Sequence, residues 1–198
     1  MTKKIISKDY FADYIKGEVY NYGLKCASPL FESDEREVVF VAQGEEKKIH
    51  IVHDSNSRKF LQVHVATQAR AEIEIILIAK EGSALDSYVE ILHEGDGGKS
   101  RLMVHGYTEG NGRIISRIRT HVPHEVFHVH ATQSVQLYQF GTEGVIDCIP
   151  ILEIQNKTTV SSHAVRLEKI SESEYWQAAR NGIVSEIYQD LKKESLRK

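Results

Sequence analysis

The chain has 198 residues, with 25 basic and 28 acidic side chains and a formal net charge of −3 at pH 7. This length is enough for one domain that buries most of its apolar surface without disulfides or metals. The near balance of charge gives no sequence-wide reason to expect nucleic acid or an anionic membrane as a partner.

The sequence predicts neither a secretory signal nor a membrane span. The apolar run after the first two lysines is too short, and too soon interrupted by charge, to be the core of a signal peptide. The longest apolar run, Ile75 to Ala79, is far below the ~20 residues that a bilayer requires. Cys26 and Cys148 lie far apart and form no C-x-x-C pair. We therefore expect a cytoplasmic protein without structural disulfides.

Residues 1–36 are expected to form a short helix and a loop. Phe11, Tyr14 and Ile15 have helical spacing behind a possible Ser7 cap, which predicts an amphipathic helix from Ser7 to Tyr20. Asn21 to Arg36 mixes turn residues with few periodic apolar positions and is predicted to connect this helix to the rest of the chain.

Residues 37–170 are predicted to form a β core. Short runs rich in Val, Ile, Phe and Tyr recur between turn residues, and several alternate strictly, as in Ile49 to His53. Alternation puts apolar side chains on one face of a strand and polar ones on the other. The clearest runs are EVVFVAQ, KIHIVHD, KFLQVHVA, AEIEIILIAK, DSYVEILH, RLMVHGYT and GRIISRIR. Such strands need a covered inner face.

Two architectures cover that face. One is an antiparallel jelly roll or sandwich, and the other is a parallel β-helix, whose strands pair with those of the coils above and below. A spacing of about ten residues between strands suits both. No clean internal repeat decides between them.

Residues 171–198 are predicted to be helical. Ser171 and Glu174 have the spacing of a capping box, in which each residue's side chain bonds to the other's backbone N–H. Asn181-Gly182 then predicts a helix end, and a second amphipathic helix follows. The apolar and aromatic side chains of these helices are Tyr175, Trp176, Ala178, Ala179, Val184, Ile187, Tyr188 and Leu191.

A group of histidines suggests one chemical alternative. His128 and His130 are two residues apart, so on a strand they would project from the same face, as a pair of metal ligands does. A cupin-like metal site would also need a carboxylate shortly after this pair, where residues 131–134 supply none. Histidines on a solvated strand face are the commoner meaning of an isolated H-x-H.

Three segments near the C-terminus, taken together, carry a resemblance to a known family. They are D-C-I-P-I-L-E-I from Asp147 to Ile154, the Ser162-His163 pair, and S-E-S-E-Y-W-Q-A-A-R-N-G-I from Ser171 to Ile183. In this order they closely resemble the C-terminal core of the SufB/SufD family, the scaffold components of the Suf machinery for iron–sulfur cluster assembly. The resemblance extends from about Gly97 to Leu191, more loosely upstream.

The resemblance implies a right-handed parallel β-helix followed by C-terminal helices. In this family a SufB-like and a SufD-like subunit pair edge to edge through their β-helices, and the C-terminal helices dock a SufC-like ATPase. A transient iron–sulfur cluster is thought to form at the subunit interface on a SufB cysteine and a SufD histidine. By position His163 matches that histidine, and Ser134 falls, with a one-residue gap, where the cysteine stands.

Serine cannot supply the soft thiolate that iron prefers, so the chain is similar to SufD rather than SufB. Family members are usually much longer. We therefore expect a non-catalytic subunit with His163 at an interface and with Tyr175, Trp176, Ile187, Tyr188 and Leu191 docking a SufC-like ATPase. Its β-helix would pair with a SufB-like subunit or with a second copy. The alternatives are a metal-binding protein that uses His128 and His130, and a shortened structural paralogue without a cluster role.

Overall fold

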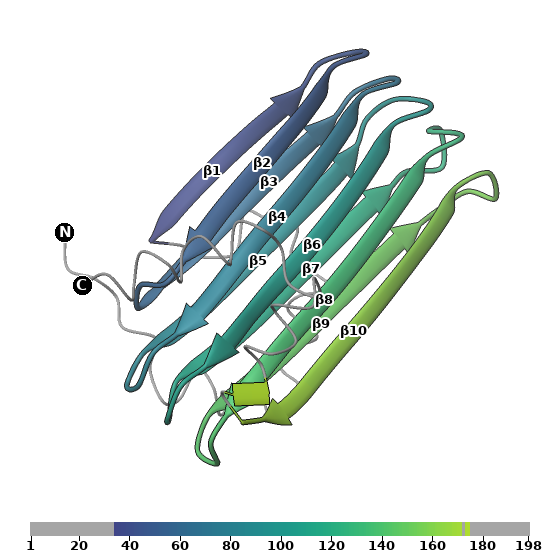
Figure 1. Cartoon of the computed structure of the whole chain (residues 1–198). Helices are drawn as coiled ribbons and strands as arrows, with labels where there is room; N and C mark the ends of the chain where they lie inside the picture. Colours follow the sequence, from purple (N-terminus) through teal and green to yellow (C-terminus); the bar gives the residue numbers. More distant parts are fainter. Residues whose placement is uncertain (1–33, 172, 175–198) are drawn as a thin grey trace.

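The structure is a computed structural model that describes residues 34–171, 173 and 174 (Figure 1). These residues form ten β-strands. They are β1 (Glu35–Val41), β2 (Glu46–His53), β3 (Ser57–Val65), β4 (Arg70–Ala79), β5 (Ala84–His93), β6 (Lys99–Thr108), β7 (Arg113–Val122), β8 (His130–Phe140), β9 (Val145–Ile154) and β10 (Val160–Ile170).

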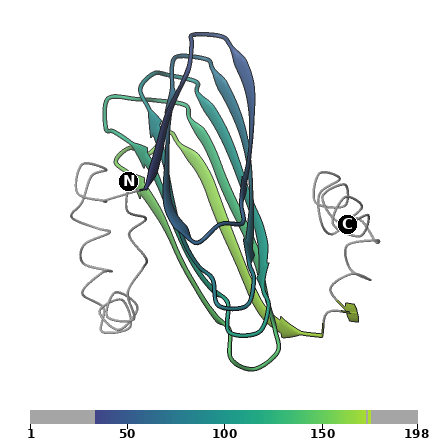
Figure 2. The ribbon, with the colours of Figure 1, turned by 90° about the vertical axis from the view of Figure 1, so that its left-hand side faces the viewer.

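The strands alternate between two parallel sheets. The odd-numbered strands form one five-stranded sheet in the order β1-β3-β5-β7-β9, and the even-numbered strands form the other in the order β10-β8-β6-β4-β2. Every pairing is parallel. Each odd strand and the even strand after it make one coil, and the coils are flattened loops in Figure 2. The predicted parallel β-helix is confirmed, and the antiparallel sandwich is wrong.

The coils differ in length, which is why the sequence shows no clean repeat. His50 pairs with Glu74 after 24 residues, whereas the later partners Arg113 and Val145 are considerably farther apart. The additional residues lie partly in the turns and partly in longer strands, so the strands stay in register while their spacing in the sequence drifts. A search for a fixed period therefore misses this repeat.

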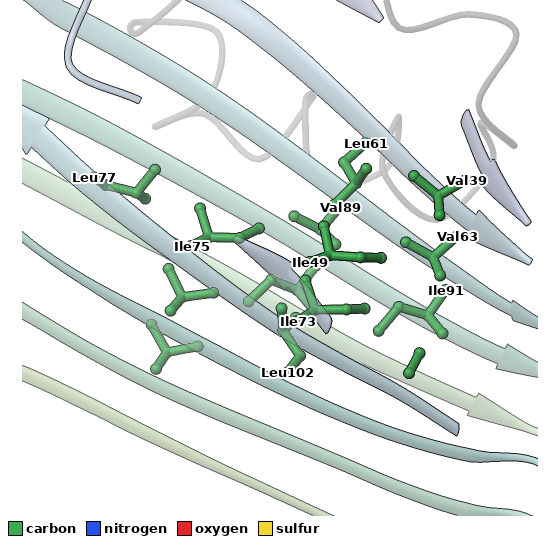
Figure 3. Close-up of a cluster of buried hydrophobic side chains, with 14 of the residues drawn as sticks. Val39, Ile49, Leu61, Val63, Ile73, Ile75, Leu77, Val89, Ile91 and Leu102 are labelled. Carbon is green, nitrogen blue, oxygen red and sulfur yellow. The ribbon is translucent and has the colours of Figure 1, made fainter. Parts of the chain in front are cut away.

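The space between the two sheets is filled by rows of aliphatic side chains. Ile49, Ile73 and Leu102 occupy paired positions on successive even strands and are buried. Figure 3 shows them in one cluster with Val63 and Ile91 of the odd sheet. Burying each such side chain stabilises the fold by about 1.5–3 kcal/mol. The β-branched residues that favour strands therefore also supply the core.

A close approach of two core strands requires glycine at position 106. Gly106 of β6 pairs with Leu77 of β4, and a Cβ at position 106 would collide with the Leu77 carbonyl oxygen and approach the Leu77 Cβ to 2.8 Å. Backbone of the neighbouring strand cannot yield to a side chain. Glycine is therefore the residue that fits this position without moving the two strands apart.

Two buried histidines lie on the inner face of the β-helix at strand ends. The His53 Nε2 is 3.0 Å from the Ser57 Oγ, and the His93 Nε2 is 2.9 Å from the Ser100 Oγ. Burial lowers the pKa of each imidazole to about 4, because the charged form would lose its hydration. Both rings are therefore neutral at pH 7.

An ionic network crosses the outer face of the odd sheet. Arg119 donates to Glu90 at 2.6 Å and to Glu153 at 2.7 Å, so it joins β5, β7 and β9. These two carboxylates raise the pKa of Arg119 although partial burial opposes them. Gln62 donates to the other oxygen of Glu90 at 2.7 Å. The buried carboxylate of Glu90 is thus fully paired.

The predicted capping box is confirmed. The Ser171 N–H donates to the Glu174 Oε2 at 2.7 Å, and the Glu174 N–H donates to the Ser171 Oγ at 3.3 Å. Ser173 and Glu174 are helical. The predicted helix at Ser7 to Tyr20 and the rest of the predicted C-terminal helices lie outside the described residues. Among residues 34–171, 173 and 174 no helix is long and apolar enough to span a membrane.

Candidate functional site

The candidate site is the C-terminal end of the β-helix, formed by β9 and β10. Each is the last strand of its sheet, so one edge of its backbone has no strand partner among the described residues. Every residue of β10 is exposed or half-buried. An edge strand with open hydrogen-bonding groups is a natural template for another chain.

The inner face of β10 continues the core rows but is not covered. Val165 pairs with Val135 and Leu167 pairs with Leu137. Val135 and Leu137 are 1% and 0% exposed, whereas Val165 and Leu167 are 40% and 47% exposed. The same residue types in the same rows are therefore core in β8 and surface in β10.

His163 lies in one of these inward rows, on β10. Its direct neighbour on β8 is Gln133, and the row continues through Leu102, Ile73 and Ile49. His163 is exposed, unlike the rest of its row. The structure thus places the predicted histidine at the open end, on the face that a further coil would cover.

Gln133 is a polar residue inside the β-helix, 3% exposed. Its Nε2 donates to the Thr120 Oγ1 at 2.8 Å and to the Ile151 carbonyl oxygen at 3.3 Å. Because a carbonyl oxygen only accepts, the amide must direct its nitrogen towards Ile151. The buried Oε1 is left without a hydrogen-bond partner. The sequence alone does not single out Gln133, because its place beside His163 depends on the β8–β10 register.

Ser134 and His163 lie on opposite faces of the even sheet. Ser134 pairs with Ala164 and Met103, so it is one position out of the inward row that holds Gln133 and His163. Successive side chains of a strand point to opposite faces. Within one chain, a residue at position 134 therefore does not face His163, whatever its chemistry.

Cys148 supplies no reactive thiolate. It packs against the inner core and is half-buried. Burial, with the nearby Asp147, raises the pKa of its thiol to about 12, although a hydrogen bond with Ser116 opposes the shift. The side chain is therefore a protonated thiol at pH 7, as expected for a cysteine among apolar neighbours.

The histidine pair of the metal alternative is not a strand pair. β8 begins at His130, and His128 lies before it with a φ of 58°, in the left-handed region. The His128 N–H donates to the Thr158 Oγ1 at 3.0 Å, which fixes this turn. The strand spacing assumed for His128 is therefore wrong. Within the described part of the chain, no three His, Cys, Asp or Glu side chains form a metal-binding group.

A family comparison decides the identity of this fold. The model of the SufBD core domain, described as SUF system FeS cluster assembly, matches residues 38–185. This match covers well over half of the chain. The chain belongs to the SufBD core-domain family. No curated protein matches it significantly.

Family membership gives the open end a chemical context. An FeS cluster is the cargo of this system, and a chain that holds one needs soft donors. At this end the described residues offer the imidazole of His163, whereas Ser134 is a hydroxyl on the outer face and Cys148 is a protonated inner thiol. These residues do not make a cluster site by themselves. The predicted docking residues Tyr175, Trp176, Ile187, Tyr188 and Leu191 lie outside the described residues.

Proposed function

We propose that this SufBD-family chain is a non-catalytic subunit of FeS cluster assembly. It pairs through the open C-terminal end of its β-helix with a second β-helix, either a SufB-like subunit or another copy. It docks a SufC-like ATPase through residues 175–191. His163 is then an interface histidine, and any thiolate ligand comes from the partner chain.

One observation carries the pairing proposal. The inward positions Val165 and Leu167 of β10 are exposed, although Val135 and Leu137 one coil earlier are fully buried. A β-helix partner at this end would extend both sheets and cover these positions. The free edges of β9 and β10 would gain hydrogen bonds in the same contact.

The charges on β10 are compatible with such a contact. Arg166 forms a bidentate ion pair with Glu168 on the same strand, with distances of 2.6 and 2.9 Å. Both side chains lie on the outer face, because each is one position from the inward Leu167. The strand therefore brings no uncompensated charge from this pair to the interface.

Sedimentation of the full chain tests this proposal, both alone and with a SufB-like subunit. Leu167→Asp places a charge on the inner face of β10 and should weaken the pair at least tenfold, while the chain itself stays folded. Phe40→Asp is the matched control, because Phe40 is 64% exposed on β1 at the other end. Equal pairing by the native chain and Leu167→Asp would overturn the proposal.

The ATPase contact needs its own experiment. Capture by an immobilised SufC-like ATPase should weaken strongly in Trp176→Ala and Ile187→Ala. Phe127→Ala is the control, because it removes an exposed apolar side chain elsewhere, in the loop before β8. Unchanged capture of both the Trp176 and the Ile187 variants would remove the ATPase from the proposal and leave the pairing intact.

A further inference from the structure

The buried side-chain amide of Gln133 has an oxygen atom, Oε1, that accepts no hydrogen bond from the described residues. Gln133 is 3% exposed, and its Nε2 is held by Thr120 on the opposite sheet and by the Ile151 carbonyl oxygen. These two contacts fix the plane of the amide and leave the Oε1 as an acceptor with no partner. Buried amide oxygens are rarely left in this state in native proteins.

The neighbour of Gln133 on the open side of the sheet is His163. The two residues are direct partners in the β8–β10 ladder and share the inward face of the sheet. Among the described residues, no hydrogen bond to the His163 ring is recorded, and the residue is exposed on an edge strand. The ring can therefore turn towards Gln133 without displacing core residues.

We propose that Gln133 is a positioning residue for His163. Its Oε1 accepts a hydrogen bond from the nearer ring nitrogen and thereby selects one tautomer of the neutral imidazole. The other ring nitrogen then carries a lone pair that faces the open end. A hydrogen bond to one imidazole nitrogen determines what the other can do, and ligand histidines are commonly oriented in this way.

This inference rests on the proposed role of His163 at the pairing interface, and it adds a specific requirement. A histidine that faces a partner's thiol or metal must present a bare nitrogen in a defined direction. Thr120, Ile151 and Gln133 supply that direction from both sheets, since Thr120 and Ile151 belong to the odd sheet and Gln133 to the even sheet. The polar cluster in the last closed coil thus has a function that aliphatic packing would not provide.

The ring-nitrogen chemical shifts of His163 test the proposal directly. Long-range proton–nitrogen correlation spectra of the full chain at pH 8 should show one tautomer in at least tenfold excess. Gln133→Leu removes the acceptor and should reduce that excess at least threefold. Gln133→Asn keeps an amide but is one methylene too short, and it should behave like Gln133→Leu.

Gln136→Leu is the matched control. It removes an amide from the same strand, but Gln136 pairs with Arg166 and lies on the opposite face of the sheet from Gln133 and His163, so the native tautomer should persist. Identical tautomer populations in the native chain and both Gln133 variants would overturn the inference. Sedimentation of the same samples separates the pairing proposal from the positioning role of Gln133. If the chain pairs but His163 shows no preferred tautomer, the pairing proposal holds and the positioning role is wrong. If one tautomer is preferred but the chain does not pair, the positioning role holds and the pairing proposal is wrong.

Discussion

β8 and β10 are consecutive strands of one sheet, in direct register, yet they have opposite environments. β8 alternates between buried and exposed residues along its length, whereas β10 is exposed or half-buried throughout. The apolar pattern is the same in both strands, as Val135 and Val165 or Leu137 and Leu167 illustrate. The difference lies in what covers them, because among the described residues β8 has a strand on each side and β10 has one.

This comparison separates two uses of one sequence pattern. In β8 the inward side chains stabilise the chain that contains them. In β10 the same side chains contribute little to the stability of the unpaired chain. Burying them against another surface would instead stabilise the association. The following predictions test this difference, from the largest expected effect to the smallest.

Shortening the two leucines should give very different losses of stability. Leu137→Ala leaves a cavity in a fully buried position and should lower the free energy of unfolding by about 2–5 kcal/mol. Leu167→Ala removes a half-exposed side chain and should cost less than about 1 kcal/mol in the unpaired chain. Urea unfolding of dilute protein measures both. Equal losses would mean that β10 is core in the isolated chain.

Acidification should destabilise the closed coils. The pKa of His93 is lowered to about 4 in the folded chain, below its value of about 6.5 in the unfolded chain. The unfolded state therefore binds the proton first. The stability is complete above pH 6.5 and is lost as the pH falls towards 4, by on the order of 3 kcal/mol for one such histidine.

The profile of unfolding free energy against pH checks this prediction. His93→Leu should flatten the profile between pH 6.5 and 4, whatever its effect at pH 7. The pKa of His53 is lowered to about 4 as well, so in His93→Leu the protonation of His53 should still cause a similar loss of stability on acidification. An unchanged slope in His93→Leu would show that the His93 imidazole is not excluded from water in the folded chain.

A methyl group at Gly106, where β6 lies close to Leu77 of β4, should have the smallest effect on stability of these three predictions. Gly106→Ala forces a Cβ against the Leu77 backbone and should cost about 1–3 kcal/mol through overpacking. Ser134→Ala is a control on the next strand of the same sheet, because Ser134 already has a Cβ and its substitution adds no atom. Thermal unfolding compares the two variants, and equal stability would indicate that β4 and β6 separate easily.

The sequence predicts the strands well because alternation and turn residues are local signals. The runs that begin at Glu37 and end at Arg119 correspond to β1 to β7. Strand direction is not local, and coil lengths drift because both strands and turns vary in length, so the residues alone leave parallel and antiparallel arrangements open. The resemblance carried by Asp147 to Ile154 and His163 decided between them, and the SufBD core-domain match agrees.

The site was predicted less completely. His163 was singled out from the resemblance, and the structure places it on an open strand end. Its neighbour Gln133 depends on the β8–β10 register, which a sequence does not display. The prediction that His128 and His130 lie on one strand is wrong for a local reason. His128 has a positive φ, so it is not in an extended conformation, and β8 begins two residues later at His130. The one sequence signal for Gln133 is that a polar residue stands at a position where the alternation of β8 predicts an inward side chain.

Amide hydrogen exchange along β8 and β10 tests the central claim most directly, since exchange reports local opening of each strand. The full chain is compared at low concentration and in the presence of a SufB-like subunit or of excess unlabelled chain. The account predicts fast exchange in β10 of the unpaired chain, strong protection of β10 in the pair, and slow exchange in β8 under both conditions. Exchange in β10 that stays equally fast under all conditions would contradict it.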